Sequence, residues 1–335
     1  MTDRESLVLV TGATGAVGLR VVQALCEAGH CVRCLSRDAL VGAAWPAHVE
    51  ARRGDITDLG AVRSAMQGVN AVFHLAAILH VENPPNMLQE VYERVNVKGT
   101  ATVVEAARDA GVLRIVFFST ITVYGTGRGG VLAEGSATQA ETVYARTKLA
   151  AEKIVLYACC ADGDPMGTVL RLAAVYGSRM KGNYRRLLQA LARGRFVPVG
   201  KGLNRRTLVY DRDVGQAAVL AAVHPAAAGR VYNVTNGQVH TMREIIAAMC
   251  EALGRKPPRF QLPVRPVRYA AGLCEDAARL LGLAPLVSRS TVEKFCEDMA
   301  VSGERFQAEL GFTPRYELLT GFRETVQEMR LAGEL

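Results

Sequence analysis

Several features that this chain of 335 residues lacks exclude whole classes of protein. No apolar run reaches the ~20 residues that a membrane-spanning helix requires, so we expect no membrane span. The polar and charged start of the chain leads directly into an apolar run, which indicates that no signal peptide is present. We therefore expect a cytoplasmic protein. Because half of its residues are apolar, it can form a large core.

Cysteines with metal-binding spacing are also scarce. The eight cysteines are scattered along the chain, and only Cys31 and Cys34 form a Cys-x-x-Cys unit. These two lie in a predicted strand, where positions three apart point to opposite faces. No second pair or histidine cluster completes a zinc site. We therefore expect reduced thiols and no bound metal.

Aromatic residues make up only 6% of the chain, which limits what its net charge of +8 can mean. Tyr184 and Phe196 are the aromatic residues of the densest basic segment, too few to stack on nucleic-acid bases. The segment can be a solvated face or can attract a phosphorylated small molecule, and we favour the second interpretation. Its basic residues are Arg185, Arg186, Arg193, Arg195, Lys201, Arg205 and Arg206.

What the chain does contain is a glycine motif between a predicted strand and a predicted helix. The apolar run 7–10 leads into Thr-Gly-Ala-Thr-Gly-Ala-Val-Gly at residues 11–18, and a helical stretch follows. In this context Gly12 permits a tight turn, Gly15 lets the backbone approach a pyrophosphate, and Gly18 lets the helix pack on the strand. The helix N-terminus can then bind the phosphates of a dinucleotide. The predicted contacts are Gly12, Thr14, Gly15, Ala16, Val17 and Gly18.

Strands and helices alternate through much of the chain, as in a parallel sheet with flanking helices. Strands are predicted at residues 7–10, 31–35, 71–75, 114–119, 168–172, 207–210 and 230–234. Helices are predicted near residues 18–28, 59–67, 100–110, 144–158, 214–223 and 242–253, with further helical stretches after a proline-rich bend. This order predicts an α/β fold, a Rossmann-type doubly wound parallel sheet with a smaller, mostly helical C-terminal substrate domain.

Tyr144 and Lys148 lie four positions apart in a predicted helix and therefore on one face of it. The ordinary pKa of tyrosine is about 10, so a tyrosine needs a nearby cation to act as an acid or base near neutral pH. Lys148 and an oxidised nicotinamide can supply that charge. The preceding strand ends in the hydroxyl residues Ser119 and Thr120, at the edge of a sheet where ligands bind.

With these features on one chain, the sequence resembles the extended short-chain dehydrogenase/reductases, the family of nucleotide-sugar epimerases and dehydratases. The resemblance covers nearly the whole length. It rests on the glycine motif, on Tyr144 and Lys148, and on matching residues at 54–56, 72–77, 96–100, 170–171, 175–177, 206–214, 232–234 and 310–314.

The resemblance implies a catalytic role for four residues. Tyr144 would be the acid/base, and Lys148 would bind the nicotinamide ribose and lower the pKa of Tyr144. Counting back five positions from Gly125 places the family's catalytic hydroxyl residue at Thr120. Asn96 would be the structural asparagine behind the lysine.

The resemblance also implies binding residues. Asp55 and Ile56 would flank the adenine, and Arg206 would bind the diphosphate of a sugar nucleotide. Ser119, Thr120 and Tyr144 would contact the substrate. The remaining cofactor contacts would be Leu75, Ala76, Ala77 and Lys148.

The end of the second predicted strand bears on the choice of cofactor. Members that prefer NAD carry an acidic residue at the position of Ser36, where it binds the ribose 2′-hydroxyl. Here Ser36 is followed by Arg37, a pair that suits a 2′-phosphate. We therefore expect NADP, with NAD as the alternative if Asp38 turns towards the ribose.

Other departures from the family pattern bear on the substrate. Ala174 stands where many sugar-nucleotide members have an asparagine. A second diphosphate-binding arginine has only loose matches, at Arg289 and Lys294. After Thr120, Ile121 and Thr122 replace the acidic pair of the dehydratases, which disfavours dehydration.

We therefore expect hydride transfer at C4 of a nucleotide sugar, by a 4-epimerase or a 4-ketoreductase. The alternative is an NADPH-dependent ketone or aldehyde reductase similar to dihydroflavonol reductases or 3β-hydroxysteroid dehydrogenases, which Arg37 and Ala174 favour. A third possibility is a catalytically silent protein that senses NADP. The presence of Thr120, Tyr144 and Lys148 argues against a catalytically silent protein.

The pattern also predicts a division of the chain. Residues 1–177 would form the nucleotide-binding domain, with 206–236 returning to add strands, and 178–205 and 237–335 would bind substrate. Loops at 80–89, 125–141 and 178–184 would set specificity. As in the family, helices 100–110 and 144–158 would form a homodimer through alanine-rich faces, at Ala101, Ala106, Ala107, Ala145, Ala150 and Ala151.

Overall fold

The computed structural model describes residues 6–37, 49–79, 86–126, 129–280, 293 and 295–335. Asp38, Arg289 and Lys294, which were named above, lie outside these residues. Parts of the loops 80–89 and 125–141 also lie outside them.

Seven parallel strands form the central sheet, in the order β3-β2-β1-β4-β5-β6-β9. Strand order reverses between β1 and β4, which is the switch point where open α/β sheets bind ligands. The predicted doubly wound parallel sheet is therefore confirmed. The strands are β1 (Leu7–Thr11), β2 (Cys31–Ser36), β3 (Val49–Arg53), β4 (Ala71–His74), β5 (Arg114–Thr120), β6 (Gly167–Leu172) and β9 (Arg230–Val234).

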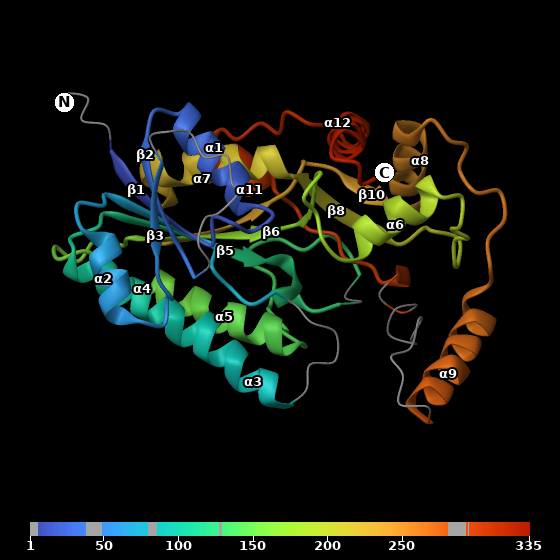
Figure 1. Cartoon of the computed structure of the whole chain (residues 1–335), viewed down its shortest axis with the longest axis horizontal. Helices are drawn as coiled ribbons and strands as arrows, with labels where there is room; N and C mark the ends of the chain where they lie inside the picture. The colour runs from blue at the N-terminus through green and yellow to red at the C-terminus, as the bar shows by residue number, and fades with distance from the viewer. Residues whose placement is uncertain (1–5, 38–48, 80–85, 127–128, 281–292, 294) are drawn as a thin grey trace.

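Helices cover both faces of this sheet (Figure 1). One layer holds α1 (Gly18–Glu27), α7 (Asp211–Val223) and α11 (Glu304–Leu310). The other holds α2 (Leu59–Met66), α4 (Gly99–Asp109) and α5 (Val143–Leu156).

Successive side chains of β1 pack alternately against the two helix layers. Val8 and Val10 pack with α1 and α7, whereas Leu9 packs with α2 and α4. This alternation follows from the two-residue period of a strand and produces two separate apolar cores.

A second sheet, of three strands, lies beside the first. Its order is β10-β8-β7, from β7 (Ala174–Tyr176), β8 (Arg205–Tyr210) and β10 (Val239–Thr241). The expectation that the segment 206–236 adds its strands to the main sheet is therefore wrong for β8, although β9 does pair with β6.

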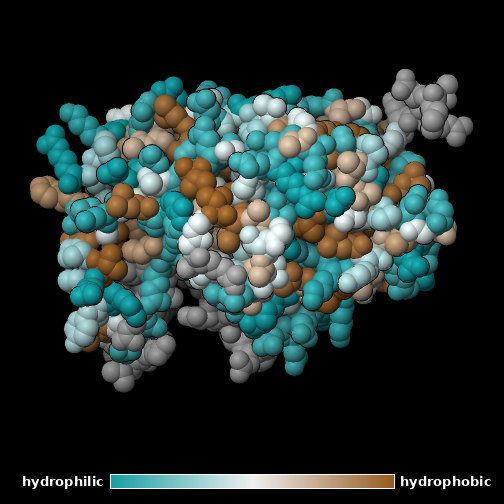
Figure 2. Space-filling view, turned by 180° about the vertical axis from the view of Figure 1, so that it is seen from behind, coloured by the Kyte–Doolittle hydropathy of each residue, from teal (hydrophilic) through white to brown (hydrophobic). Residues whose placement is uncertain are grey.

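The third core lies between the small sheet and the C-terminal helices. It contains residues of α6 (Asn183–Ala192), α8 (Met242–Leu253) and α12 (Leu318–Leu331). Helix α9 (Val264–Leu280) lies at the end of the molecule that is farthest from α2 (Figure 1). On the surface, apolar side chains lie in small patches between hydrophilic ones (Figure 2), as is usual for globular proteins.

The alanine-rich faces proposed for dimerisation are largely used inside the chain. Ala106, Ala107, Ala145 and Ala151 are buried between the helices and the sheet, whereas Ala101 is exposed and Ala150 is half-buried. The homodimer stays a prediction. No helix among the described residues has the length and apolar character that crossing a membrane requires.

Candidate active site

The turn between β1 and α1 brings three backbone segments into close contact. Gly12 has φ +74°, and a Cβ there would lie 2.6 Å from the backbone nitrogen of Ala76. A Cβ on Gly18 would lie 2.3 Å from the carbonyl oxygen of Gly12, so only glycine lets α1 start this close to the strand. The side chain of Val17 does not cap α1. This N-terminus therefore fits the pyrophosphate of a dinucleotide.

The predicted adenosine-binding residues come together at the ends of β2 and β3. These strands pair in parallel, so Ser36 lies opposite Arg53, next to the loop with Asp55 and Ile56. Ser36 is buried and its carbonyl accepts from the Gly54 N–H at 2.9 Å, whereas Arg37 is exposed. The exposed guanidinium of Arg37 therefore follows β2 directly, at the position predicted for the adenosine ribose of a dinucleotide.

Asp55 and Ile56 have different surroundings. Oδ1 of Asp55 accepts from the backbone N–H and the hydroxyl of Thr57, both at 2.9 Å, which fixes the loop. Ile56 is buried beside Gly99, where an added Cβ would lie 2.7 Å from its Cδ1 atom. On the β4 side, Leu75, Ala76 and Ala77 are half-buried.

A buried histidine that the sequence did not single out supports the glycine turn. The two ring nitrogens of His74 lie 2.7 Å from the Thr11 hydroxyl and 3.0 Å from the Thr100 hydroxyl. The Thr11 hydroxyl also accepts from the N–H of Ala76 at 3.3 Å. Burial, and then the positive charge of Lys148, lower the pKa of His74 to about 3. The ring is therefore neutral at physiological pH.

Asn96 joins the segment that follows β4 to helix α5. It lies in a π-helical segment, Glu93–Lys98, that links α3 (Asn86–Tyr92) to α4. Its buried amide accepts from the Ile78 N–H at 2.8 Å and donates to the Thr147 hydroxyl at 3.2 Å. Thr147 in turn donates to the carbonyl of Tyr144 at 2.9 Å. Asn96 therefore holds the first turn of α5 against the sheet.

Helix α5 places Tyr144 and Lys148 on one side. The hydroxyl of Thr142 caps it by accepting from the Ala145 N–H at 3.1 Å, so Tyr144 lies in the first turn and is half-buried. Lys148 is buried, with Nζ 3.9 Å from the centroid of the Phe117 ring.

Burial shifts both groups towards their neutral forms. It lowers the pKa of Lys148 to about 7, against the opposing effect of the Glu152 carboxylate. Burial, and then Tyr92, raise the pKa of Tyr144 to about 12. In the chain itself the phenol is therefore protonated. The lowered pKa of Tyr144, which is expected beside an oxidised nicotinamide, stays a prediction.

The hydroxyl residues at the end of β5 face different surroundings. Thr120 is half-buried, and its hydroxyl accepts from the Thr122 N–H at 3.2 Å at the start of a 3-10 turn, Ile121–Tyr124. Ser119 is buried and donates to a carboxylate oxygen of Glu152. Its hydroxyl proton is thus used inside the protein, and a contact of Ser119 with the substrate stays a prediction.

Glu152 and Arg171 form a buried ion pair that the sequence analysis did not identify. Nη2 of Arg171 lies 2.6 Å from Oε2 of Glu152, and Nε lies 3.1 Å from Oε1. The guanidinium also covers the ring of Tyr124 at 4.8 Å, and the Tyr124 hydroxyl donates to Asn233 at 2.8 Å. The available signal was an arginine inside the apolar strand β6, since buried charges are rare unless paired.

The small sheet places Arg206 in a partly buried position on β8. Its Nη1 lies 4.0 Å from a carboxylate oxygen of Glu297. The neighbouring Arg205 pairs with Asp298 at 2.6 Å and donates to the Gly130 carbonyl at 3.2 Å. Gly130 belongs to the loop that follows Thr120 and the 3-10 turn, so β8 begins beside that loop.

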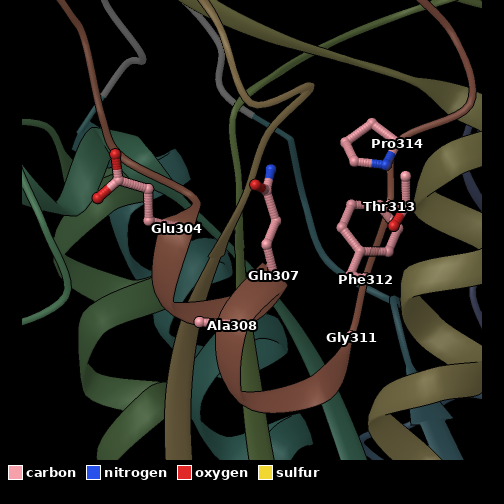
Figure 3. A pocket seen from close by; sticks show the side chains of 7 residues that line it. All are labelled: Glu304, Gln307, Ala308, Gly311, Phe312, Thr313 and Pro314. Atoms are coloured by element: carbon pink, nitrogen blue, oxygen red, sulfur yellow. The ribbon is translucent and has the colours of Figure 1, made fainter.

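A surface pocket at the end of α11 contains none of the predicted site residues (Figure 3). Two of its polar side chains, Glu304 and Gln307, lie on α11, and Phe312, Thr313 and Pro314 follow the helix. The candidate active site lies elsewhere, between the glycine turn, β5 and α5.

The model of the NAD dependent epimerase/dehydratase family matches residues 8–235, from β1 to β9. This chain belongs to that family. The resemblance to the extended short-chain dehydrogenase/reductases is confirmed, and this epimerase/dehydratase family member is an enzyme that depends on NAD or NADP.

Curated relatives of this family member act on different substrates. It is 29% identical to "3 beta-hydroxysteroid dehydrogenase/Delta 5-->4-isomerase" of Mycobacterium tuberculosis, over 94% of this chain and 88% of the relative. It is 28% identical to "N-acetyl-alpha-D-glucosaminyl-diphospho-ditrans,octacis-undecaprenol 4-epimerase" of Escherichia coli O157:H7, over 96% of this chain and 94% of the relative.

A solved structure shares the fold of the whole epimerase/dehydratase family member. MoeE5 in complex with UDP-glucose and NAD superimposes with a TM-score of 0.75 and 27% identity, and the match covers 97% of this chain and 99% of that one.

Proposed function

We propose that this enzyme reduces the C4 ketone of a nucleotide sugar with NADPH. The observation that carries the proposal is the exposed Arg37 after β2, which suits the exchangeable NADPH that a reductase consumes, while Tyr144 and Lys148 lie one turn apart on α5. A protonated phenol is a general acid, which is what a carbonyl oxygen needs while it gains a hydride.

Four residues of the chain would take part in the reduction. When bound, the cofactor supplies a hydride to the C4 carbon. Tyr144 donates its phenolic proton to the C4 oxygen, and the Thr120 hydroxyl at the end of β5 holds that oxygen. Lys148, when protonated, stabilises the phenolate that Tyr144 becomes, until a proton from water restores the phenol. Asn96 holds the first turn of α5 in place through Thr147.

The preference for NADP rests on the end of β2. Ser36 and the exposed Arg37 offer a hydroxyl and a cation where a 2′-phosphate would lie. Reduction of a ketone also consumes one cofactor in each turnover, so an exchangeable NADPH suits it. We expect Arg37→Ala to weaken NADPH binding about tenfold or more and to leave NADH binding within about twofold. Titration of cofactor fluorescence checks this difference.

The preference for a nucleotide sugar rests on the basic residues of β8 and α6. Arg206 is a partly buried cation on β8, beside the loop that follows Thr120, and a diphosphate has the matching charge. A second candidate is reduction of an apolar ketone. Ala174 on β7, in place of a polar side chain, and the hydroxysteroid dehydrogenase relative favour it.

The test compares two ketones under the same conditions. With NADPH, a UDP-linked 4-keto sugar should be turned over, whereas a 3-keto steroid should not. Tyr144→Phe should lower kcat by roughly 100- to 10,000-fold on the active substrate, because the proton donor is lost. Tyr157→Phe is the matched control, since Tyr157 is exposed at the end of the same helix.

Two outcomes would contradict the proposal. Turnover of the steroid alone would establish the second candidate. Release of near-stoichiometric NAD from the denatured protein, with interconversion of UDP-sugars and no net reduction, would establish a 4-epimerase.

A further inference from the structure

The positive charge of this chain is concentrated in two stretches, 193–203 and 255–274. They contain eight cations and no Asp or Glu. The other thirty-two Lys and Arg of the chain balance its thirty-two Asp and Glu, so these stretches account for the whole net charge of +8. The cations are Arg193, Arg195, Lys201, Arg255, Lys256, Arg259, Arg265 and Arg268, and all eight are exposed.

The two stretches lie side by side in the fold. Val199 pairs with Leu262, and Gly200 donates to the Leu262 carbonyl at 2.8 Å. A Cβ on Gly194 would lie 3.2 Å from Nη1 of Arg255. We call the combined surface of residues 193–203 and 255–274 the basic face.

Large apolar side chains are exposed on the same basic face. Phe260 is 83% exposed and Tyr269 is 71% exposed. The others are Val197, Leu203, Leu262 and Leu273. Single exposed apolar side chains are usual, but six of the thirteen large ones among the described residues lie on this face, and such clustering is typical of an interaction site.

Helix α9 separates a buried side from an exposed apolar side. Val264, Val267 and Ala271 are partly or fully buried, at the spacing of one helical face. Tyr269 and Leu273, four positions apart, lie on the opposite face and are exposed. Arg265 and Arg268 lie between these two faces, and Arg268 forms an exposed ion pair with Glu293 at 3.1 Å. Up to Cys274, α9 presents apolar residues flanked by cations to solvent, which is the pattern of a helix that lies in a membrane interface, and the acidic Glu275 and Asp276 follow in its next turn.

We propose that the basic face docks this enzyme on an anionic lipid surface. The cations would lie at the level of the lipid headgroups, and Phe260, Tyr269 and Leu273 would enter the boundary of the acyl chains. The apolar side chains favour a lipid surface over a nucleic acid, which would leave Leu262 and Leu273 exposed. The charge favours an anionic bilayer over a second copy of this chain, whose basic face would repel it.

The test measures binding to sedimented vesicles and does not depend on turnover, so it is independent of the proposed reaction. Vesicles of phosphatidylcholine with 30% phosphatidylglycerol should bind the full chain at least about tenfold more tightly than vesicles of phosphatidylcholine alone. Binding to the anionic vesicles should weaken strongly at 0.5 M salt, because exposed charges are screened.

Two groups of variants separate the charge from the apolar contribution. The triple variant K256E/R259E/R265E should bind anionic vesicles roughly a hundredfold more weakly. The pair Y269S/L273S should weaken the same binding roughly tenfold while leaving the charge unchanged. Matched controls are R52E on β3 for charge and Y157S/L113S, at the end of α5 and just before β5, for exposed apolar residues, and they should change nothing.

Several results would overturn the proposal, and the first three concern binding. They are equal binding to neutral and anionic vesicles, unchanged binding of the triple variant with an unchanged Tm, and binding to an oligonucleotide duplex but not to vesicles. Sedimentation of a dimer that K256E/R259E/R265E dissociates, without vesicle binding, would assign the basic face to self-association instead.

Discussion

His74 shows how one residue can fix both the local structure and its response to pH. The Thr100 hydroxyl donates to the Asn96 carbonyl at 2.7 Å, so it has to accept from Nε2 of His74. Nδ1 is then the acceptor for the Thr11 hydroxyl. The neutral ring satisfies both partners, whereas a second proton on it would be buried near the Lys148 ammonium.

The first prediction concerns stability in acid. The pKa of His74 is about 3 in the folded chain and 6.5 in the unfolded chain, so between these values only the unfolded chain binds the proton. His74 therefore makes the free energy of unfolding fall by about 1.4 kcal/mol for each pH unit below 6.5. His74→Gln should remove this part of the pH dependence. Urea unfolding from pH 7.5 to 4.5 measures it, and parallel curves for both chains would contradict it.

Individual residues also show which contacts cannot be predicted from the sequence. The glycine motif, Tyr144 and Lys148 could be found because their spacing follows from backbone geometry. The hydrogen bond from Ser119 to Glu152 could not be predicted, because Glu152 lies 33 positions further along the chain. Charged residues such as Glu152 and Arg171 are usually exposed, so nothing local to either one shows that they meet in the core.

Strands could be predicted from the sequence where helices cover both faces of the sheet. β1, β4 and β5 are continuous apolar runs because helices pack on both faces of the sheet. β3 was not predicted, because it lies at the edge of the sheet and Ala51, Arg52 and Arg53 are exposed. β7 and β10 have three residues each, too few for a recognisable pattern. No sequence pattern predicted the π-helical segment around Asn96.

The second prediction concerns the junction of α5, β5 and β6. Glu152 on α5 binds Ser119 of β5 and Arg171 of β6, and both charges are buried. Glu152→Gln should lower the free energy of unfolding by about 3–5 kcal/mol, because a buried guanidinium loses its counter-charge. Urea denaturation measures this loss.

The control for this prediction is an exposed ion pair between helices of the same layer. Arg63 of α2 and Asp109 of α4 are 2.6 Å apart but half exposed. Asp109→Asn should therefore change the free energy of unfolding by less than about 1 kcal/mol. A similar loss for both variants would mean that burial of the Glu152 pair has no special effect.

At the scale of the whole molecule, one ionic network joins the start of α1 to the C-terminal helix. Glu328 of α12 forms ion pairs with Arg20 of α1 and Arg212 of α7, and the Ser178 hydroxyl donates to it. Arg20 also lies 3.2 Å from Asp211 of α7. These ion pairs connect the layer of α1 and α7 to helix α12 of the third core, in addition to the covalent chain.

The third prediction is that this network stabilises the whole fold in a pH-dependent way. Burial opposes ionisation of Glu328, but hydrogen bonds from Ser178 and Arg212 and the charge of Arg20 lower its pKa overall. Its contribution is therefore complete above the unfolded pKa of 4.5 and is lost as the pH falls below that value. Glu328→Gln should cost about 1–3 kcal/mol at pH 7, since Glu328 is only partly buried.

The matched control is Glu251 of α8, which pairs with Arg323 of α12 at 2.8 Å with both side chains largely exposed. Glu251→Gln should cost less than about 1 kcal/mol, because water screens that pair. The two variants remove the same charge from a pair that involves α12, so the difference between them isolates the connection to α1. If calorimetry at pH 7 gave equal Tm values for both variants, the network would not couple the two parts of the molecule. A difference that persists at pH 3 would also count against it, because Glu328 is then largely protonated in the unfolded chain and its advantage over glutamine should shrink.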